Sequence, residues 1–151
     1  MTENAASSFV YVSYIRTTPE KLWLALTDAE FMKQYWFGTY CESEWKSGSS
    51  WRMIQPGGQV SDIGEIVEAV PAKRLVIKWR NEFRPDLKSE GQSICTMDIE
   101  QVQDAVKLTI THSINREKSK FIEAVSGGWP RILSNLKSLL ETGEIVLATK
   151  P

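Results

Sequence analysis

The stretch from Lys118 to Glu141 constrains the fold of this chain more than any other. Its apolar residues recur at steps of three, four and one, which places them on one continuous face of an α-helix. At about 1.5 Å per residue such a helix would be roughly 36 Å long, and it needs a broad sheet to lie against. The apolar positions are Phe121, Ile122, Val125, Trp129, Ile132, Leu133, Leu136, Leu139 and Leu140.

The residues before this helix predict strands joined by short turns. Phe9 to Arg16 is rich in β-branched and aromatic residues and predicts the first strand. The cap and proline at Thr18-Pro19, followed by a restart at Thr27 to Glu30, predict two short helices. From Gly38 to Ser113 the pattern is again that of strands, and short turns pair such strands antiparallel. The sequence therefore predicts an α+β fold, in which a curved antiparallel sheet of about six to seven strands grips the long C-terminal helix.

Three details qualify this outline. Gly64 lies inside a predicted strand, where it indicates a bulge or a close packing point. The polar stretch from Asn81 to Gln92 predicts a mobile loop that carries Phe83 and Leu87. Pro130 lies beside Gly127-Gly128 within the long helix and removes a backbone donor, so we expect a kink or a break there, with Trp129 turned inward.

Length and composition indicate one domain, over residues 9–143, with short tails at 1–8 and 144–151. The formal net charge of −1 disfavours nucleic acid as a partner, and no apolar run is long enough to span a bilayer. Cys41 and Cys95 are far apart and form no CxxC pair, which points to a reducing cytoplasm while leaving a single disulfide open. No motif for a cofactor or a metal ion is present, so none is expected.

Several strings in their joint order resemble the helix-grip, START-like superfamily. Within it, the chain resembles the family named for the activator of Hsp90 ATPase. The resemblance runs from Phe9 to Gly143, and no single string decides it. The strings are Thr18 to Asp28, Trp36-Phe37-Gly38, Gly64 to Glu68 followed by Pro71, Arg74 to Trp79, Val106 to His112 and Gly128-Trp129 through Leu140.

The resemblance implies a cavity between the long helix and the sheet. In related proteins this space binds lipids, sterols, polyketides or plant hormones, and a minority of the superfamily are cyclases or hydroxylase subunits. The named co-chaperone has two domains and contacts a chaperone ATPase through both. This chain resembles only the START-like one, so chaperone activation is the weaker implication.

Aromatic residues from separate elements are the candidates for the walls of such a cavity. The alternative is that these rings fill the core, as tryptophans usually do, and the sequence leaves both readings open. The candidate ligand-binding residues are Phe31, Tyr35, Trp36, Trp51, Trp79, Phe83, His112, Trp129 and Leu133.

His112 is the single histidine and lies on the apolar-phase face of its strand. If it faces the cavity it can bind a ligand or act as an acid or base near neutral pH; the favoured interpretation is a hydrogen-bonded histidine at the rim of the core. One histidine without a cluster of carboxylates or thiols makes no usual metal site. We therefore expect a hydrophobic small molecule as the partner, with a chaperone-binding module as the alternative and a cyclase-type enzyme using His112 as a third hypothesis.

Overall fold

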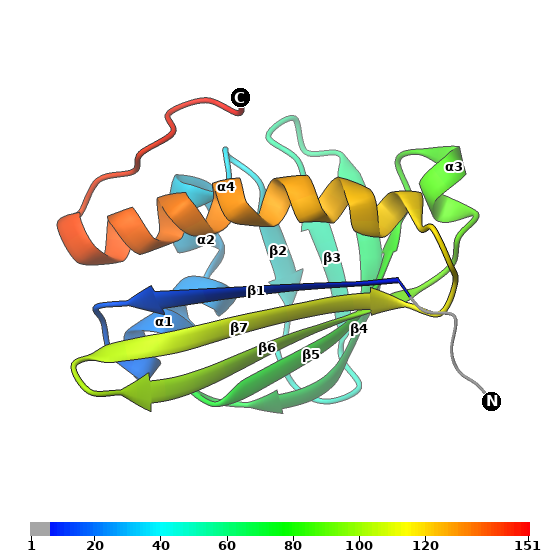
Figure 1. Ribbon diagram of the computed structural model, residues 1–151. Helices are drawn as coiled ribbons and strands as arrows, with labels where there is room; N and C mark the ends of the chain where they lie inside the picture. The colour runs from blue at the N-terminus through cyan, green and yellow to red at the C-terminus, as the bar shows by residue number, and fades with distance from the viewer. Residues whose placement is uncertain (1–6) are drawn as a thin grey trace.

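A computed structural model describes residues 7–151 of the chain, and residues 1–6 lie outside the described part. The described residues form seven strands and four helices, which follow the predicted order except that the short helix α3 was not predicted (Figure 1). The described residues contain no helix long and apolar enough to cross a membrane. The elements are β1 (Ser7–Ile15), α1 (Pro19–Thr27), α2 (Ala29–Tyr35), β2 (Tyr40–Ser43), β3 (Ser50–Ile54), β4 (Val60–Val70), β5 (Arg74–Asn81), α3 (Pro85–Lys88), β6 (Ser93–Val102), β7 (Ala105–Ile114) and α4 (Lys120–Thr142).

The strands form one antiparallel sheet in the order β1-β7-β6-β5-β4-β3-β2. Strands β2 to β7 are joined consecutively, whereas β1 and β2 lie at opposite edges and are connected by α1 and α2 (Figure 1). Side chains alternate along β7 and along β6 as far as Ile99, with one face buried and the other accessible. The α+β helix-grip prediction is confirmed, because α4 lies across the sheet and the core fills the space between them.

Helix α4 is continuous, so the predicted break at Pro130 is wrong. Ser119 caps its N-terminus with a side-chain bond from Ile122 N, and Gly143 ends it with a φ of 86°. Pro130 removes one donor only, and buried residues on both sides hold the helix to the sheet, which accounts for its persistence through the proline. Figure 1 shows no sharp bend in α4. Trp129 does turn inward, as expected, and is 2% exposed.

The segment from Asn81 to Gln92 is anchored where the sequence predicts a mobile loop. It contains the short helix α3, whose Leu87 is buried in the core. Glu90 accepts hydrogen bonds from Ser119 Oγ at 2.6 Å and from Lys120 N at 2.8 Å, which ties this segment to the start of α4. The polar composition of this segment suggested a mobile loop, but Leu87 packs in the core and the Glu90 carboxylate binds the start of α4.

Gly64 is a close packing point between β4 and β5, as the sequence predicts. A Cβ atom at this position would lie 1.7 Å from the carbonyl oxygen of Lys78 on the neighbouring strand. Only glycine lets the two backbones approach this closely. The close approach draws β5, and with it Trp79, toward β4.

Candidate functional site

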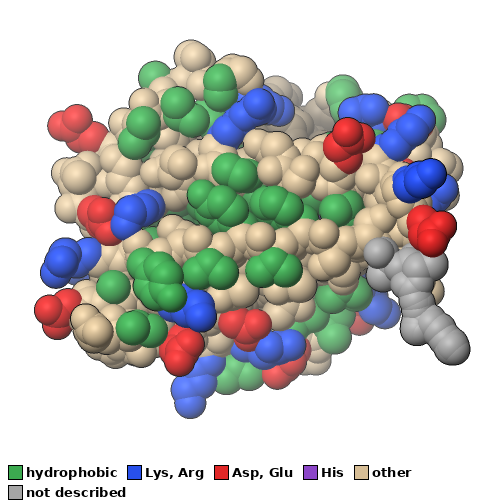
Figure 2. Space-filling view, in the orientation of Figure 1, with side chains coloured by type: hydrophobic (Ala, Val, Ile, Leu, Met, Phe, Trp, Pro, Cys, Tyr) green, Lys and Arg blue, Asp and Glu red, His purple; other side chains and the backbone are tan. Residues whose placement is uncertain are grey.

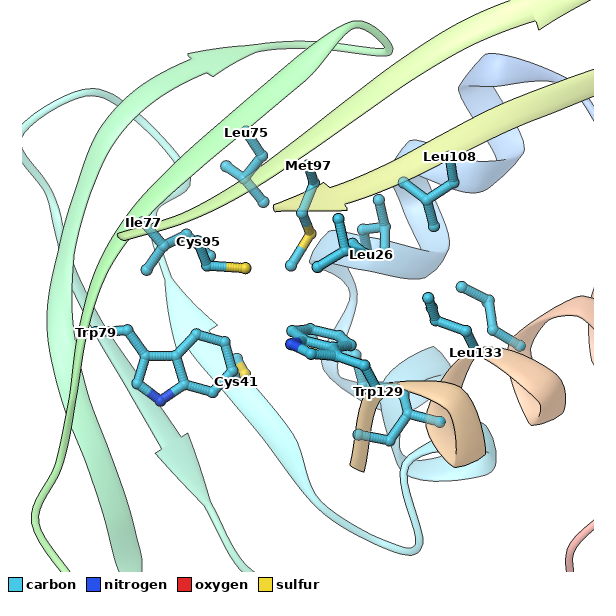
Figure 3. Packing of buried hydrophobic residues seen from close by; sticks show 14 of the residues in the cluster. Leu26, Cys41, Leu75, Ile77, Trp79, Cys95, Met97, Leu108, Trp129 and Leu133 are labelled. Atoms are coloured by element: carbon cyan, nitrogen blue, oxygen red, sulfur yellow. The ribbon is translucent and has the colours of Figure 1, made fainter. Parts of the chain in front are cut away.

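Four tryptophans from separate elements meet between α4 and the sheet, and we call them the tryptophan cluster. Trp51 lies on β3, Trp79 on β5, Trp129 on α4 and Trp36 at the end of α2. The ring centroids of Trp51 and Trp79 are 4.7 Å apart, and those of Trp36 and Trp129 are 5.6 Å apart. Figure 3 shows Trp79 and Trp129 pointing toward one another from the sheet and from the helix. These distances are those of directly packed aromatic rings.

The inner side of the tryptophan cluster is closed. The space that Tyr35, Trp51 and Leu133 line there measures about 10 Å³, which is at most the room for one water molecule. Trp51 Nε1 is buried in this region without a hydrogen-bond partner. These three residues were predicted to line a ligand cavity, and in the structure they pack as core.

The outer side of the cluster is open, and this hollow we call the α4 cavity. It has a volume of about 170 Å³ and lies between α4, the middle of the sheet and α3. Predominantly apolar side chains form its walls, with Asp62 and Asn81 as polar exceptions. The lining residues are Trp36, Met53, Asp62, Trp79, Asn81, Leu87, Phe121, Ala124, Val125, Gly128, Trp129 and Ile132.

A wider hollow of about 700 Å³ adjoins the α4 cavity, and we call it the C-terminal groove. The residues after α4 form one of its walls, through Ile145 and Lys150, and α2 and the following turn form another. The α4 cavity and the groove share four lining residues, namely Trp36, Met53, Gly128 and Ile132. A Cβ atom added to Gly128 would meet nothing within 4 Å. Gly128 therefore leaves open space at the boundary that the two hollows share, and we call this boundary the passage.

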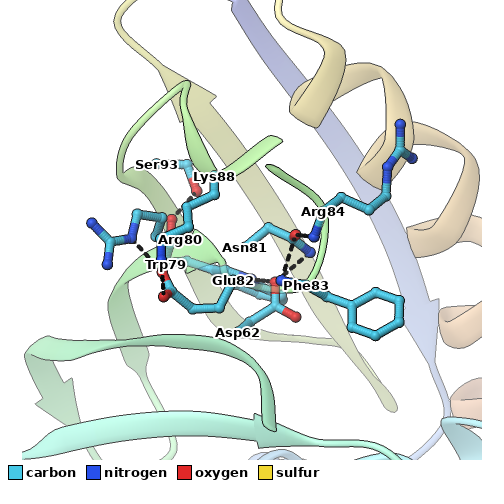
Figure 4. Close-up of polar contacts among 9 residues, drawn as sticks. All are labelled: Asp62, Trp79, Arg80, Asn81, Glu82, Phe83, Arg84, Lys88 and Ser93. Carbon is cyan, nitrogen blue, oxygen red and sulfur yellow. Dashed lines mark hydrogen bonds and ion pairs between the residues drawn. The ribbon is translucent and has the colours of Figure 1, made fainter. Parts of the chain in front are cut away.

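Asp62 supplies a buried carboxylate in the wall of the α4 cavity. It is 4% exposed, and its Oδ2 accepts hydrogen bonds from Trp79 Nε1 at 2.7 Å and Asn81 Nδ2 at 3.3 Å (Figure 4). Burial raises the pKa of Asp62, and the hydrogen bonds to its charged form offset only part of that effect. The register of β4 and β5, which places Asp62 opposite Asn81, creates this group.

His112 is fully enclosed by polar and aromatic partners. Trp129 Nε1 donates to His112 Nδ1 at 3.2 Å, and because an indole N–H only donates, Nδ1 must be the unprotonated nitrogen. His112 Nε2 therefore carries the proton and donates to Ser93 Oγ at 2.9 Å, and Ser93 donates to the Trp79 carbonyl. Burial lowers the pKa of His112 to about 3. The histidine is a neutral, hydrogen-bonded part of the core, deeper than the rim position expected from the sequence.

The predicted site residues thus divide into three groups. Trp36, Trp79 and Trp129 line the α4 cavity, whereas Tyr35, Trp51 and Leu133 line only the closed space. His112 is enclosed behind Trp129, and Phe31 packs at the side of Tyr35 with 6.4 Å between ring centroids. Phe83 is 57% exposed, and Figure 4 shows its ring pointing away from Asp62 and Trp79.

The wall of the α4 cavity that runs along α4 was, apart from Trp129, not among the predicted site residues. Four residues spaced by four, three and four form a stripe along α4, which is one side of its apolar face. An apolar stripe with a glycine in its centre indicates, from the sequence alone, a gap in the helix surface. The stripe consists of Phe121, Val125, Gly128 and Ile132. The residues of the facing sheet, by contrast, become neighbours only through strand register.

The seven-stranded antiparallel sheet, the long C-terminal helix and the two hollows beside it define a START-like helix-grip protein. More narrowly, residues 16–141 match the family described as activator of Hsp90 ATPase homolog 1-like protein, and the chain belongs to that family. No curated protein matches the chain in sequence.

Solved structures with the same fold come from bacteria and from a parasite. A protein of Mesorhizobium loti is 22% identical with a TM-score of 0.76, over 89% of this chain and 96% of the other. A Plasmodium falciparum protein described as an HSP90 activator is 26% identical with a TM-score of 0.72, over 88% and 95%. The Aha1 dimer from Colwellia psychrerythraea is 20% identical with a TM-score of 0.73, over 91% and 98%.

Proposed function

We propose that this protein binds a small apolar molecule, aromatic or lipid-like, in the α4 cavity. The observation that carries the proposal is that the apolar α4 cavity shares four lining residues, Gly128 among them, with an open groove. A cavity with aromatic walls and a few polar groups is the usual form of a small-molecule site. The single histidine supports binding rather than catalysis, because both of its ring nitrogens are engaged inside the core.

The size of the α4 cavity suits one ring or a short chain. An apolar protein cavity of about 150 Å³ accepts benzene, and the α4 cavity measures about 170 Å³. Each square ångström of apolar ligand surface removed from water contributes about 25 cal/mol before the costs of ordering. A ligand larger than one ring would extend past Gly128 into the C-terminal groove.

The two adjacent glycines of α4 offer a matched pair of variants. Gly128→Leu places a side chain in the passage, whereas Gly127→Leu places the same side chain on an exposed position that lines neither hollow. Both changes raise helix propensity equally. We expect free indole, used as the test ligand, to shift the side-chain N–H resonances of Trp36, Trp79 and Trp129 in the wild type and in Gly127→Leu. Gly128→Leu should weaken indole binding at least tenfold, and equal binding by all three proteins would contradict the proposal.

A chaperone-binding role is the second candidate, and an exposed apolar row favours it. Val10, Val12 and Tyr14 are 57%, 42% and 51% exposed on the outer face of the edge strand β1, and Figure 2 shows this row of hydrophobic side chains. Exposed apolar patches often mark protein contacts. The family and the description of the Plasmodium falciparum protein suggest an Hsp90-type ATPase as the partner. Two buried free thiols, Cys41 and Cys95, support a reducing cytoplasm as the location.

An ATPase assay separates the two candidates. If the row on β1 contacts an Hsp90-type chaperone, the protein should stimulate its ATP hydrolysis and Val12→Asp should reduce that stimulation. Val67→Asp is the matched control, because Val67 is 40% exposed on β4, four strands away in the sheet. Absence of stimulation by the wild type, or equal loss in both variants, would remove this candidate.

A further inference from the structure

Within residues 7–151, the lining of the C-terminal groove includes basic side chains and no acidic one. Three basic residues line it, Lys33, Arg131 and Lys150, together with apolar and uncharged polar residues. Lys33 is paired with Glu30 at 2.8 Å and lies over the ring of Tyr40. Neither Arg131 nor Lys150 makes an ion pair or a side-chain hydrogen bond with any of residues 7–151. The groove therefore presents two uncompensated positive charges.

Arg131 occupies the position from which a cation can reach a molecule in the passage. It follows Gly128 by three residues and precedes Ile132 by one, and all three line the groove. Helical residues three apart lie side by side, with Cβ positions about 5–6 Å apart. Arg131 is half-buried, which reduces the screening of its charge by water. A guanidinium group in this setting matches the planar, two-oxygen geometry of a carboxylate.

We infer that the ligand of the α4 cavity is an amphiphilic carboxylic acid, whose apolar part enters the cavity and whose carboxylate binds Arg131 at the edge of the groove. This inference rests on the proposed function. Asp62 fixes the orientation, because a ligand carboxylate placed inside the α4 cavity would meet a second carboxylate in its wall. One turn of helix separates Gly128 from Arg131, so a linker of a few methylene groups joins the two parts.

Phenylbutyrate and phenylbutanol form the test pair, because they share a ring and a linker and differ in the terminal group. Binding is followed at pH 8 by the total tryptophan fluorescence and by the side-chain N–H resonances of Trp36, Trp79 and Trp129. We expect the wild type to bind the acid about tenfold more tightly than the alcohol. This preference should shrink with added salt, but less than for a fully exposed arginine, because half-burial limits the screening of the Arg131 charge.

Arg131→Gln should abolish the preference for the acid and leave the affinity for the alcohol unchanged. Arg52→Gln is the control, since Arg52 is an exposed arginine paired with Glu42 on the sheet and lines neither hollow. If the wild type binds both compounds equally, or if Arg131→Gln keeps the preference, the carboxylate assignment is overturned while the proposed function stands. If neither compound binds, the proposed function and this inference both fail.

Discussion

His112 shows how one buried residue can organise the centre of the fold without chemistry of its own. Its two nitrogens connect Trp129 of α4 to Ser93 of β6, and Ser93 continues to the backbone of β5. A neutral imidazole is needed for this chain of bonds, because a protonated Nδ1 has no lone pair for the Trp129 N–H. Protonation of His112 would therefore break the link between helix and sheet.

The free energy of unfolding should decrease as the pH is lowered, because of His112. Its pKa is about 3 in the folded protein and about 6.5 in an unfolded chain. Below pH 6.5 the unfolded state binds a proton that the folded state does not, so the free energy of unfolding decreases by up to about 1.4 kcal/mol per pH unit down to about pH 3. Urea unfolding at pH 8, 7, 6 and 5 measures this slope.

His112→Asn is the comparison that isolates the effect, because every other titrating group remains in place. The variant should be less stable at pH 8, since a smaller side chain leaves part of the site empty. The difference in unfolding free energy between wild type and variant should narrow as the pH falls below 6.5. Two parallel curves would show that His112 is not the residue whose titration destabilises the protein.

Gly64 sets the spacing of two strands, and an added methyl group should be costly. Gly64→Ala places Cβ against the Lys78 carbonyl oxygen, which is backbone and has no rotamer to change. We expect a loss of about 3 kcal/mol in unfolding free energy. Gly57→Ala is the control, because open space surrounds that glycine and the change should stay within about 0.5 kcal/mol. Equal losses at the two positions would contradict the close approach of β4 and β5.

At the scale of the element, α4 combines features that seldom coexist in one helix. It carries two glycines and a proline in its central turns, all of which lower helix stability, yet it runs unbroken for 23 residues. The packing of α4 against the sheet, and the N-terminal cap formed by Ser119 and Glu90, offset the loss of helix stability caused by the two glycines and the proline. Gly128 lines both hollows and leaves a gap in the helix surface, whereas Pro130 is half-buried and lines neither hollow.

Pro130→Ala should therefore stabilise the protein. The variant regains an N–H that can donate to the Ser126 carbonyl, at the cost of a more flexible unfolded chain. We expect a net gain of about 1–2 kcal/mol in unfolding free energy, measured by urea titration. Pro19→Ala is the matched control, because Pro19 is the first residue of α1, where the backbone needs no donor, and it should bring no gain. A gain of the same size at both prolines would disprove the explanation.

At the scale of the whole molecule, periodicity predicted the strands, the long helix and their packing faces but not α3, and it could not predict where empty space remains. The tryptophans, the apolar face of α4 and the strand alternation are local patterns, and each is present in the structure. Whether the four tryptophan rings pack together or enclose a void depends on how closely segments that are far apart in the sequence approach one another. Differences smaller than the size of one side chain decide the outcome. Asp62 shows the same limit, because its burial depends on the register of β4 with β5.

The residues after α4 contain no helix or strand, yet they belong to the packed structure through Asn135. This side chain is fully buried, and its Oδ1 accepts hydrogen bonds from Val146 N at 3.0 Å and Leu147 N at 2.7 Å. Its Nδ2 donates to the Leu147 carbonyl at 2.9 Å and to the Tyr35 carbonyl at 3.4 Å. One amide thus joins α2, α4 and the C-terminal wall of the groove.

This arrangement predicts that Asn135 and the C-terminal segment are energetically coupled. Asn135→Leu leaves the N–H groups of Val146 and Leu147 without their side-chain acceptor, and removal of residues 144–151 leaves the buried Asn135 amide without most of its partners. Each change alone should cost about 1–3 kcal/mol in unfolding free energy. Once Asn135 is leucine, removing the segment leaves no unpaired amide behind and should cost little more. Urea unfolding of the four proteins would then give a coupling energy of about 1–3 kcal/mol, whereas strictly additive losses would mean that the segment is held by other contacts.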